Sequence, residues 1–196
     1  MTSKTLSAAV FFGLLGLSIM TVKDITAKEA TPPAAQQGIQ DSKKTPEPIA
    51  KKAPIAVHPE IPLSPELQRF TRAQAFENGV PYILALAVME QESRFQLDAD
   101  GGDSFGVMQI NECHGPKEII IEPHENIRIG CYLLGAFYRE YRDWNKALVA
   151  YNCGPAGAEQ MYFRHGSISS PYSREVMFRS ENFARLLGEP SVLMPK

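Results

Sequence analysis

The sequence predicts a mainly α-helical domain in the last two thirds of a chain of 196 residues. Aromatic side chains, which a core needs, are concentrated there: 16 of 18 lie in the range 70–183 and none in the range 14–69. Prolines show the opposite distribution, because eight of the 15 lie in the range 32–65. After residue 64 no run alternates apolar and polar side chains as a half-buried strand would, whereas helix start and stop signals recur. We therefore expect one small helical domain, 64–190.

The first 27 residues are predicted to act as a signal peptide or a signal anchor. Lys4 precedes an uncharged stretch of 17 residues, 6–22. That length lies between the apolar core of a signal peptide, about 7–15 residues, and a spanning helix of about 20 residues. Ala27 is a candidate end of a cleaved signal, although Ile25 stands where a small residue is preferred. Both alternatives export the rest of the chain to the periplasm or cell envelope, either released or anchored to the cytoplasmic membrane by residues 6–22.

Residues 28–63 are predicted to form a disordered linker. They are rich in proline, alanine and lysine and contain no aromatic residue. Such a composition cannot bury enough apolar surface to offset the entropy lost on ordering. The linker is either a tether that lets the domain reach a target away from the membrane or a connection of no special length.

The charge of the domain argues against a nucleic-acid partner. Residues 66–196 contain 13 Lys and Arg against 17 Asp and Glu, a net charge of −4. No basic run and no stripe of alternating basic and aromatic residues occurs there. We therefore do not expect the domain to bind nucleic acid by neutralising its phosphates.

Two helices are predicted at the start of the domain. Ser64 and Pro65 have the residue types of a helix N-cap and first turn, and Gly79 ends this segment. Pro81 can begin a second helix that runs to Glu92. Residues 82–89 are apolar on every side, so this helix is expected at the centre of the core.

Further helices are expected in the rest of the domain. A third follows from apolar residues at helical spacing, namely Ile127, Cys131, Leu134, Tyr138 and Tyr141. Later signals place a short helix at 146–151, stopped by Gly154 and Pro155, where another can begin, and a last helix from Ser170 and Pro171 to Leu187. Between the second and third helices, residues 98–105 are a turn-rich loop and residues 119–121 are the candidate for a short strand.

Glu92, at the C-terminal end of the apolar helix, is the candidate for acid chemistry. Burial, the negative end of the helix dipole and the neighbouring Glu90 all favour its protonated form, and only Arg94 opposes them. A carboxyl with a raised pKa can donate a proton to a leaving group near neutral pH. The alternative is a solvated glutamate that simply ends the helix. Because the preceding turns are apolar all round, periodicity does not choose between Glu90 and Glu92.

The pattern around Glu92 resembles a known family. Four blocks occur in order: Glu92-Ser93, then GVMQI at 106–110, then NIRIGCYL at 126–133, then AYNCGP at 150–155. Each block is ordinary alone, but the ordered set resembles the soluble lytic transglycosylases, relatives of goose-type lysozyme. The resemblance covers about residues 66–187. It departs at Cys153, where alanine is usual in the family, and at Cys113, which follows the second block.

The resemblance implies a lysozyme-like helical fold with a glycan-binding cleft. It implies cleavage of the β-1,4 bond between N-acetylmuramic acid and N-acetylglucosamine in peptidoglycan. Glu92 matches the single catalytic acid and base. The residues assigned to substrate binding are Ser93, Ser104, Met108, Gln109, Tyr151 and Asn152. Two structural alternatives stay open, since Met108 could serve as core packing and Tyr151 could only brace a helix junction.

The matched blocks contain no second acid, which bears on the mechanism. Retaining and inverting glycosidases use two carboxyl groups, at separations of about 5–5.5 Å and about 6.5–9.5 Å respectively. With one carboxyl, the substrate's own N-acetyl group can attack the anomeric carbon. Glu92 first donates its proton to the glycosidic oxygen as that bond breaks. It then removes the proton of the muramoyl C6 hydroxyl, whose oxygen displaces the N-acetyl group and closes a 1,6-anhydro ring. The alternatives are a hydrolytic lysozyme and a non-catalytic peptidoglycan-binding module.

The expected partners are peptidoglycan glycan strands, with a membrane contact only through the N-terminal segment. By analogy with compact specialised members of the family, the domain could open the wall for a secretion, conjugation or other envelope machine. We expect a monomer. No nucleic acid partner is expected.

No metal or cofactor is expected. The segment that begins at Asp98 resembles a calcium-binding loop in its aspartates, but it has Asp103 in place of the glycine at position six and Gln109 in place of the glutamate at position twelve. The cysteines and histidines lack zinc-site spacing. Cys113 and Cys153 each follow a cleft block, so if those blocks face each other a disulfide between them is expected in an oxidising compartment. The alternative is three reduced, packed thiols.

Overall fold

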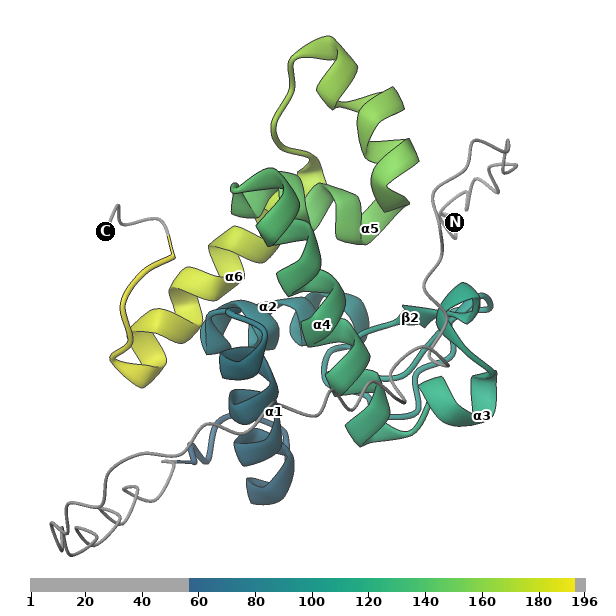
Figure 1. Ribbon diagram of the computed structural model, residues 1–196. Helices are drawn as coiled ribbons and strands as arrows, with labels where there is room; N and C mark the ends of the chain where they lie inside the picture. The colour runs from purple at the N-terminus through teal and green to yellow at the C-terminus, as the bar shows by residue number, and fades with distance from the viewer. Residues whose placement is uncertain (1–56, 193–196) are drawn as a thin grey trace, which may run out of the picture. The chain divides into compact units, whose positions relative to one another are not determined.

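The computed structural model describes residues 57–192, which all lie within the unit Ala50–Lys196 (Figure 1). The helices in chain order are α1 (Pro65–Glu77), α2 (Tyr82–Ser93), α3 (Lys117–Ile120), α4 (Pro123–Tyr141), α5 (Trp144–Met161) and α6 (Pro171–Leu187). Two short 3-10 helices, η2 (Glu112–His114) and η3 (Phe163–His165), and two strands, β1 (Ser104–Phe105) and β2 (Ile110–Asn111), complete the described elements. The predicted mainly α-helical fold class is confirmed. The predicted export segment lies outside the described residues.

Helix α2 lies at the centre of the core. Every residue from Tyr82 to Met89 is buried, as the sequence predicts. The helix packs along α6 and also contacts α1 (Figure 1). Because full burial of one leucine side chain contributes about 2 kcal/mol, Leu84 and Leu86 alone give this helix a firm position. The end of α2 is therefore held by the body of the domain.

The helix boundaries follow the capping signals of the sequence. The Ser64 hydroxyl accepts a hydrogen bond from the Leu67 amide at 3.2 Å and so caps α1. At the start of α6, Ser170 and Ser173 form a reciprocal capping box. Gly79, with φ of +69°, ends the α1 segment as predicted.

Helix α5 is interrupted where the sequence predicts a stop. Gly154 has φ of +71° and ψ of 160°, which no helix accommodates, and Pro155 follows it. The predicted short helix before this point and a new helix beginning at Pro155 are both confirmed. Helix α5 packs against α4.

Two local features differ from the sequence predictions. The candidate strand at 119–121 is wrong: Pro116 caps the start of α3, which spans these residues up to Ile120. An unpredicted hairpin joins β1 and β2, pairing Ser104 with Asn111 and Phe105 with Ile110. Strands of two residues are too short to produce a detectable alternation, which is why the pattern missed them.

The predicted linker ends earlier than residue 63. Ile61 and Leu63 are buried in the core. The buried Gln68 amide donates hydrogen bonds to the carbonyls of His58, Ile61 and Leu63 at 3.0–3.3 Å, and its oxygen accepts the His58 amide at 2.8 Å. This one side chain fastens the segment to α1, and only a structure reveals it because glutamine carries no apolar signal. The folded domain thus includes residues 57–63, and the rest of the linker lies outside the described residues.

Between residues 57 and 192, no helix combines the length and the apolar character that crossing a membrane requires.

Candidate active site

Glu92 lies in the last turn of α2 and faces the start of α6. Its Oε1 accepts a hydrogen bond from the Tyr172 hydroxyl at 2.5 Å, although the two residues are 80 positions apart. Such short bonds are typical of a hydroxyl that donates to a carboxylate. The site is therefore assembled between two helices that are distant in the sequence and adjacent in the core.

The environment of Glu92 raises the pKa of its carboxyl to about 7. The main cause is burial, which penalises the charged form, and the hydrogen bond from Tyr172 lowers the pKa by a smaller amount. Near neutral pH the group therefore populates both its protonated and its ionised form. A carboxyl in this range can donate a proton and later accept one.

Glu90 and Glu92 have different partners. Glu90 Oε2 lies 3.1 Å from Nη1 of Arg179, in an ion pair between α2 and α6. Glu92 has a phenol as its hydrogen-bond partner instead. Of the two glutamates that the sequence leaves open, Glu92 is thus the one placed to change its protonation state.

Tyr151 lies in the first part of α5 and donates a hydrogen bond to the Met108 carbonyl at 2.9 Å. Burial first, and the nearby charge of Glu92 second, raise the pKa of its hydroxyl well above 10. The same two causes lead for Tyr172. Both phenols therefore stay neutral and can donate hydrogen bonds beside Glu92.

Ser93 is buried and connects the end of α2 to the segment that follows β1. Its hydroxyl is within hydrogen-bond distance of the Val107 carbonyl, at 2.8 Å, and of the Met89 carbonyl, at 3.2 Å. The first contact ties the segment after β1 to the end of α2. Its side chain thus joins two backbone segments and does not open to solvent.

Met108 and Asn126 form the inner support of that segment. The Met108 side chain is fully buried against Gly130, where an added Cβ would overlap its sulfur atom. The buried Asn126 accepts the Met108 amide at 2.7 Å and donates to the carbonyls of Phe105 and Ile120 at 2.6 Å each. The packing alternative for Met108 therefore describes its side chain, while its carbonyl faces Tyr151.

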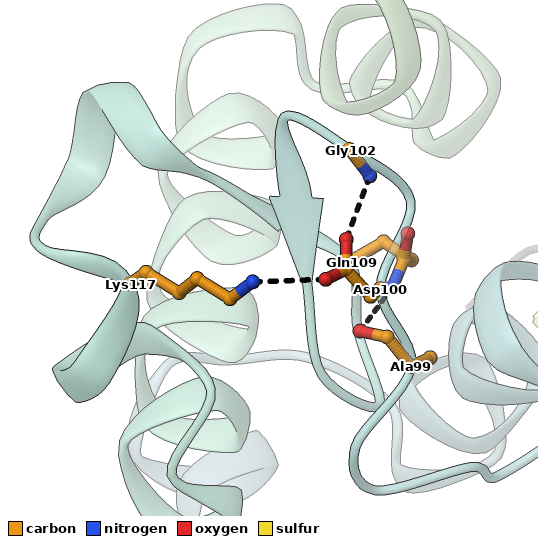
Figure 2. A network of polar contacts seen from close by, with 5 residues as sticks. All are labelled: Ala99, Asp100, Gly102, Gln109 and Lys117. Carbon is orange, nitrogen blue, oxygen red and sulfur yellow. Dashed lines mark hydrogen bonds and ion pairs between the residues drawn. The ribbon is translucent and has the colours of Figure 1, made fainter.

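Gln109 orders the loop that precedes the hairpin. Its amide donates to the carbonyls of Ala99, at 3.3 Å, and Gly106, at 3.0 Å. Figure 2 shows the contact of Gln109 with Ala99 beside a second group of contacts, in which Asp100 pairs with Lys117 at 2.8 Å and accepts the Gly102 amide at 3.0 Å. The two interactions fix the loop between α2 and α3. Asp100, one of the loop aspartates, is thereby engaged in loop structure.

The remaining predicted binding residues are more accessible. Asn152 is exposed on α5, directly after Tyr151. Ser104 is half-buried in β1, and its hydroxyl oxygen lies 3.5 Å from the Asn111 amide nitrogen. The structure thus brings Glu92, Ser93, Met108 and Tyr151 together around the end of α2. Asn152 is exposed, and Ser104 and Gln109 are half-buried.

Tyr172 is the main residue of the candidate site that sequence reasoning missed. It belongs to none of the four blocks, and no local pattern connects it to Glu92. The available signal was the helix start at Ser170 and Pro171, which places an aromatic residue in the first turn of α6. Asn126 lies in the third block, but its role as a buried connector depends on carbonyls that only the fold brings together.

The predicted disulfide between Cys113 and Cys153 is not formed. All three cysteines are free. Cys113 is exposed on η2, whereas the Cys153 thiol donates to the Val149 carbonyl of its own helix at 3.1 Å. The two blocks do meet, because the Tyr151 hydroxyl donates to the Met108 carbonyl, but their cysteines are not bonded to each other. Within residues 57–192 no group of three His, Cys, Asp or Glu side chains is arranged to hold a metal ion.

The chain is similar to known proteins over this same region. Residues 70–165 match the family model described as "Transglycosylase SLT domain". The 70 kDa soluble lytic transglycosylase SLT70 from Escherichia coli has 19% identity and a TM-score of 0.57, over 69% of this chain and 26% of that one. An inactive glutamate-to-glutamine mutant of the lytic transglycosylase Slt from Pseudomonas aeruginosa has 22% identity and a TM-score of 0.53, over 66% and 25%.

These two structures share the fold of the domain, and the chain spans about a quarter of the length of each. No curated protein sequence shows significant similarity to the chain.

Proposed function

We propose that the protein is a peptidoglycan lytic transglycosylase, from the premise that residues 70–165 match the transglycosylase SLT domain family. The observation that carries the proposal is the position of Glu92, whose carboxyl has a pKa of about 7 at the end of a buried helix. The bond that the enzyme cleaves would be the β-1,4 linkage between N-acetylmuramic acid and N-acetylglucosamine. A relative from Pseudomonas aeruginosa is inactive as a glutamate-to-glutamine mutant, which supports a glutamate as the reactive group.

In the first step, protonated Glu92 donates its proton to the glycosidic oxygen as the bond to the anomeric carbon breaks. The carbonyl oxygen of the substrate's N-acetyl group attacks that carbon and forms a cyclic oxazolinium intermediate. Tyr172 donates a hydrogen bond to the carboxylate that this step produces, and so stabilises it. A pKa near 7 supports the proposal because the proton is bound at rest and released without great cost.

In the second step, the Glu92 carboxylate removes the proton of the muramoyl C6 hydroxyl. The C6 oxygen attacks the anomeric carbon, the bond to the acetamido oxygen breaks, and a 1,6-anhydro ring closes. The carboxyl is protonated again, so one residue acts first as acid and then as base. Neither step consumes water.

For substrate binding we propose a division between contact and support. Asn152, which is exposed, and Ser104 and Gln109, which are half-buried, are the residues proposed to contact the glycan. Ser93 and Met108 are buried and would act by holding the backbone of the cleft wall. The Tyr151 hydroxyl donates to the Met108 carbonyl. Because this phenol lies near Glu92 and stays uncharged, it would place a neutral polar group beside the reacting carboxyl.

The cellular setting is part of the proposal. A chain with an export segment at 1–27 and a linker would act on the wall from the periplasm or cell envelope, either as a free monomer or beside an envelope machine. Removal of residues 1–27 should leave the protein in the cytoplasm. Recovery of the intact chain in the membrane fraction would favour the anchor over the cleaved signal.

Product analysis tests the activity. Purified peptidoglycan is digested with the full-length protein, and the released muropeptides are identified by mass spectrometry. We expect 1,6-anhydro-muramoyl ends. Reducing muramoyl ends would show a hydrolytic lysozyme, and binding without release would show a non-catalytic module.

A further inference from the structure

Arg179 of α6 engages three residues with its three guanidinium nitrogens. Its Nε donates to Oε1 of Gln91 at 3.0 Å. Its Nη1 pairs with Oε2 of Glu90 at 3.1 Å, and its Nη2 pairs with Oε1 of Glu175 at 2.9 Å. Gln91 and Glu90 belong to the last turn of α2, whereas Glu175 belongs to α6. The guanidinium therefore bridges the two helices in a fixed, planar arrangement that a single ammonium group could not reproduce.

The contacts of α6 fall on consecutive residues of α2. Arg179 binds residues 90 and 91, and Tyr172 binds residue 92. Tyr172 and Arg179 are seven residues apart, so they lie on one face of α6, about two turns from each other. The two helices pack along one another (Figure 1). Two separate attachments thus determine how the end of α2 sits against α6.

The contacts with α6 stabilise the last turn of α2. The chain leaves the helix through two residues with left-handed backbone angles, Arg94 with φ of 55° and Phe95 with φ of 65°. The last turn of any helix lacks some internal hydrogen bonds and frays unless tertiary contacts hold it. Glu92 lies in this turn, so the position of its carboxyl depends on the contacts to α6.

We propose that Arg179 is a positioning residue of the active site, which holds the last turn of α2 so that Glu92 stays in hydrogen-bond contact with Tyr172. The inference rests on the proposed function of Glu92. Arg179 contacts neither Glu92 nor the reacting bond and acts through the helix. Its side chain is 30% exposed and that of Glu90 is 34% exposed, so the ion pair is partly withdrawn from solvent and less screened than a surface pair.

The test is a double-mutant cycle on the full-length protein with purified peptidoglycan as substrate. Arg179→Met is expected to lower kcat about tenfold with KM changed less than about twofold, since tenfold equals about 1.4 kcal/mol of transition-state stabilisation. In a Tyr172→Phe background, the same substitution is expected to lower kcat by less than about threefold, because the contact that it positions is already gone. Arg179→Lys should recover part of kcat. Arg185→Met, an exposed arginine on the same helix, should have no effect.

Equal losses in the two backgrounds would overturn the inference, as would an unchanged kcat for Arg179→Met. Should Arg179→Met fail to fold by circular dichroism, Gln91→Ala removes one of the three contacts and is expected to show the same coupling to Tyr172→Phe. If the wild-type protein cuts no peptidoglycan, the proposed function fails by itself. Amide hydrogen exchange then tests the positioning role alone. The Arg94 amide, which donates to the backbone carbonyl of Glu90, should exchange at least about tenfold faster in Arg179→Met. An unchanged exchange rate would refute the positioning role.

Discussion

The Tyr172 hydroxyl and Oε1 of Glu92 lie 2.5 Å apart, and this bond opposes the burial that raises the pKa of the carboxyl. The two influences give Glu92 a pKa of about 7. Burial alone would favour the protonated form more strongly and make the carboxylate a poorer product of proton transfer. The phenol thus supports the charged form that the second step of the proposed reaction requires.

Tyr172→Phe should shift the pH dependence of the reaction. Because the hydrogen bond from Tyr172 lowers the pKa of Glu92, its removal raises that pKa. The alkaline limb of kcat/KM, which reports loss of the proton from Glu92, should move to higher pH. The maximum rate should fall by about ten- to a hundredfold, since one hydrogen bond to a charged group contributes about 1.5–3 kcal/mol. A pH–rate profile on peptidoglycan checks both, and a limb that moves to lower pH contradicts the account.

Glu92→Gln should stabilise the protein at alkaline pH. The carboxyl ionises with a pKa of 4.5 in ordinary surroundings and about 7 in the folded protein, so folding is favoured least when the group must be charged. Stability from this group is complete below pH 4.5 and is lost as the pH rises to 7. The full shift corresponds to about 3 kcal/mol. Urea unfolding should show the variant more stable than the wild type at pH 8 and similar at pH 4, and equal stability at both pH values would contradict the burial of Glu92.

Asn126→Ala should weaken both the fold and the activity. The substitution leaves the Met108 amide and the carbonyls of Phe105 and Ile120 without their side-chain partner in a buried place. Each unpaired buried group costs about 1–3 kcal/mol, so a loss of at least about 3 kcal/mol in the free energy of unfolding is expected. Asn152→Ala is the control, because that residue is exposed and its loss should leave stability unchanged. Denaturant titration compares the two variants.

The three thiols should all be reduced and should differ in accessibility. Cys113 is exposed, Cys153 is half-buried and Cys131 is buried, and no pair forms a disulfide. Alkylation of the native protein without reductant should modify Cys113 first, and Cys131 only after unfolding. Mass spectrometry of the intact protein counts the added groups. A mass gain that appears only after reduction would restore the disulfide hypothesis.

The sequence revealed the parts of this fold whose signals are local. Ser64, Gly79, Gly154 and Ser170 mark helix boundaries by their residue types, and an all-apolar stretch identifies α2 as the central helix. Glu92 can be identified as a candidate from the sequence for the same reason, since it lies where that helix ends.

What the sequence could not reveal depends on contacts between distant segments. Tyr172 becomes a partner of Glu92 only because α6 packs along α2. Gln68 fastens residues 57–63 through backbone carbonyls, so composition alone assigned that segment to the linker. The disulfide prediction was wrong although the two blocks meet at Tyr151 and Met108, because contact between two segments does not determine the direction of each cysteine. The Cys153 thiol donates to a carbonyl of its own helix.

The most direct test of the central claim is the lytic activity of Glu92→Gln compared with Glu90→Gln on purified peptidoglycan. Glu92→Gln keeps the size of the side chain and removes its proton chemistry, so release of muropeptides should fall by at least about a thousandfold, with the circular dichroism spectrum unchanged. Glu90→Gln changes a residue of the same turn and weakens only one of the three contacts of Arg179, so its activity should fall by less than about tenfold, the loss expected for Arg179→Met. If Glu92→Gln retains activity, or if Glu90→Gln is the variant that loses it, the assignment of Glu92 as the acid and base is wrong.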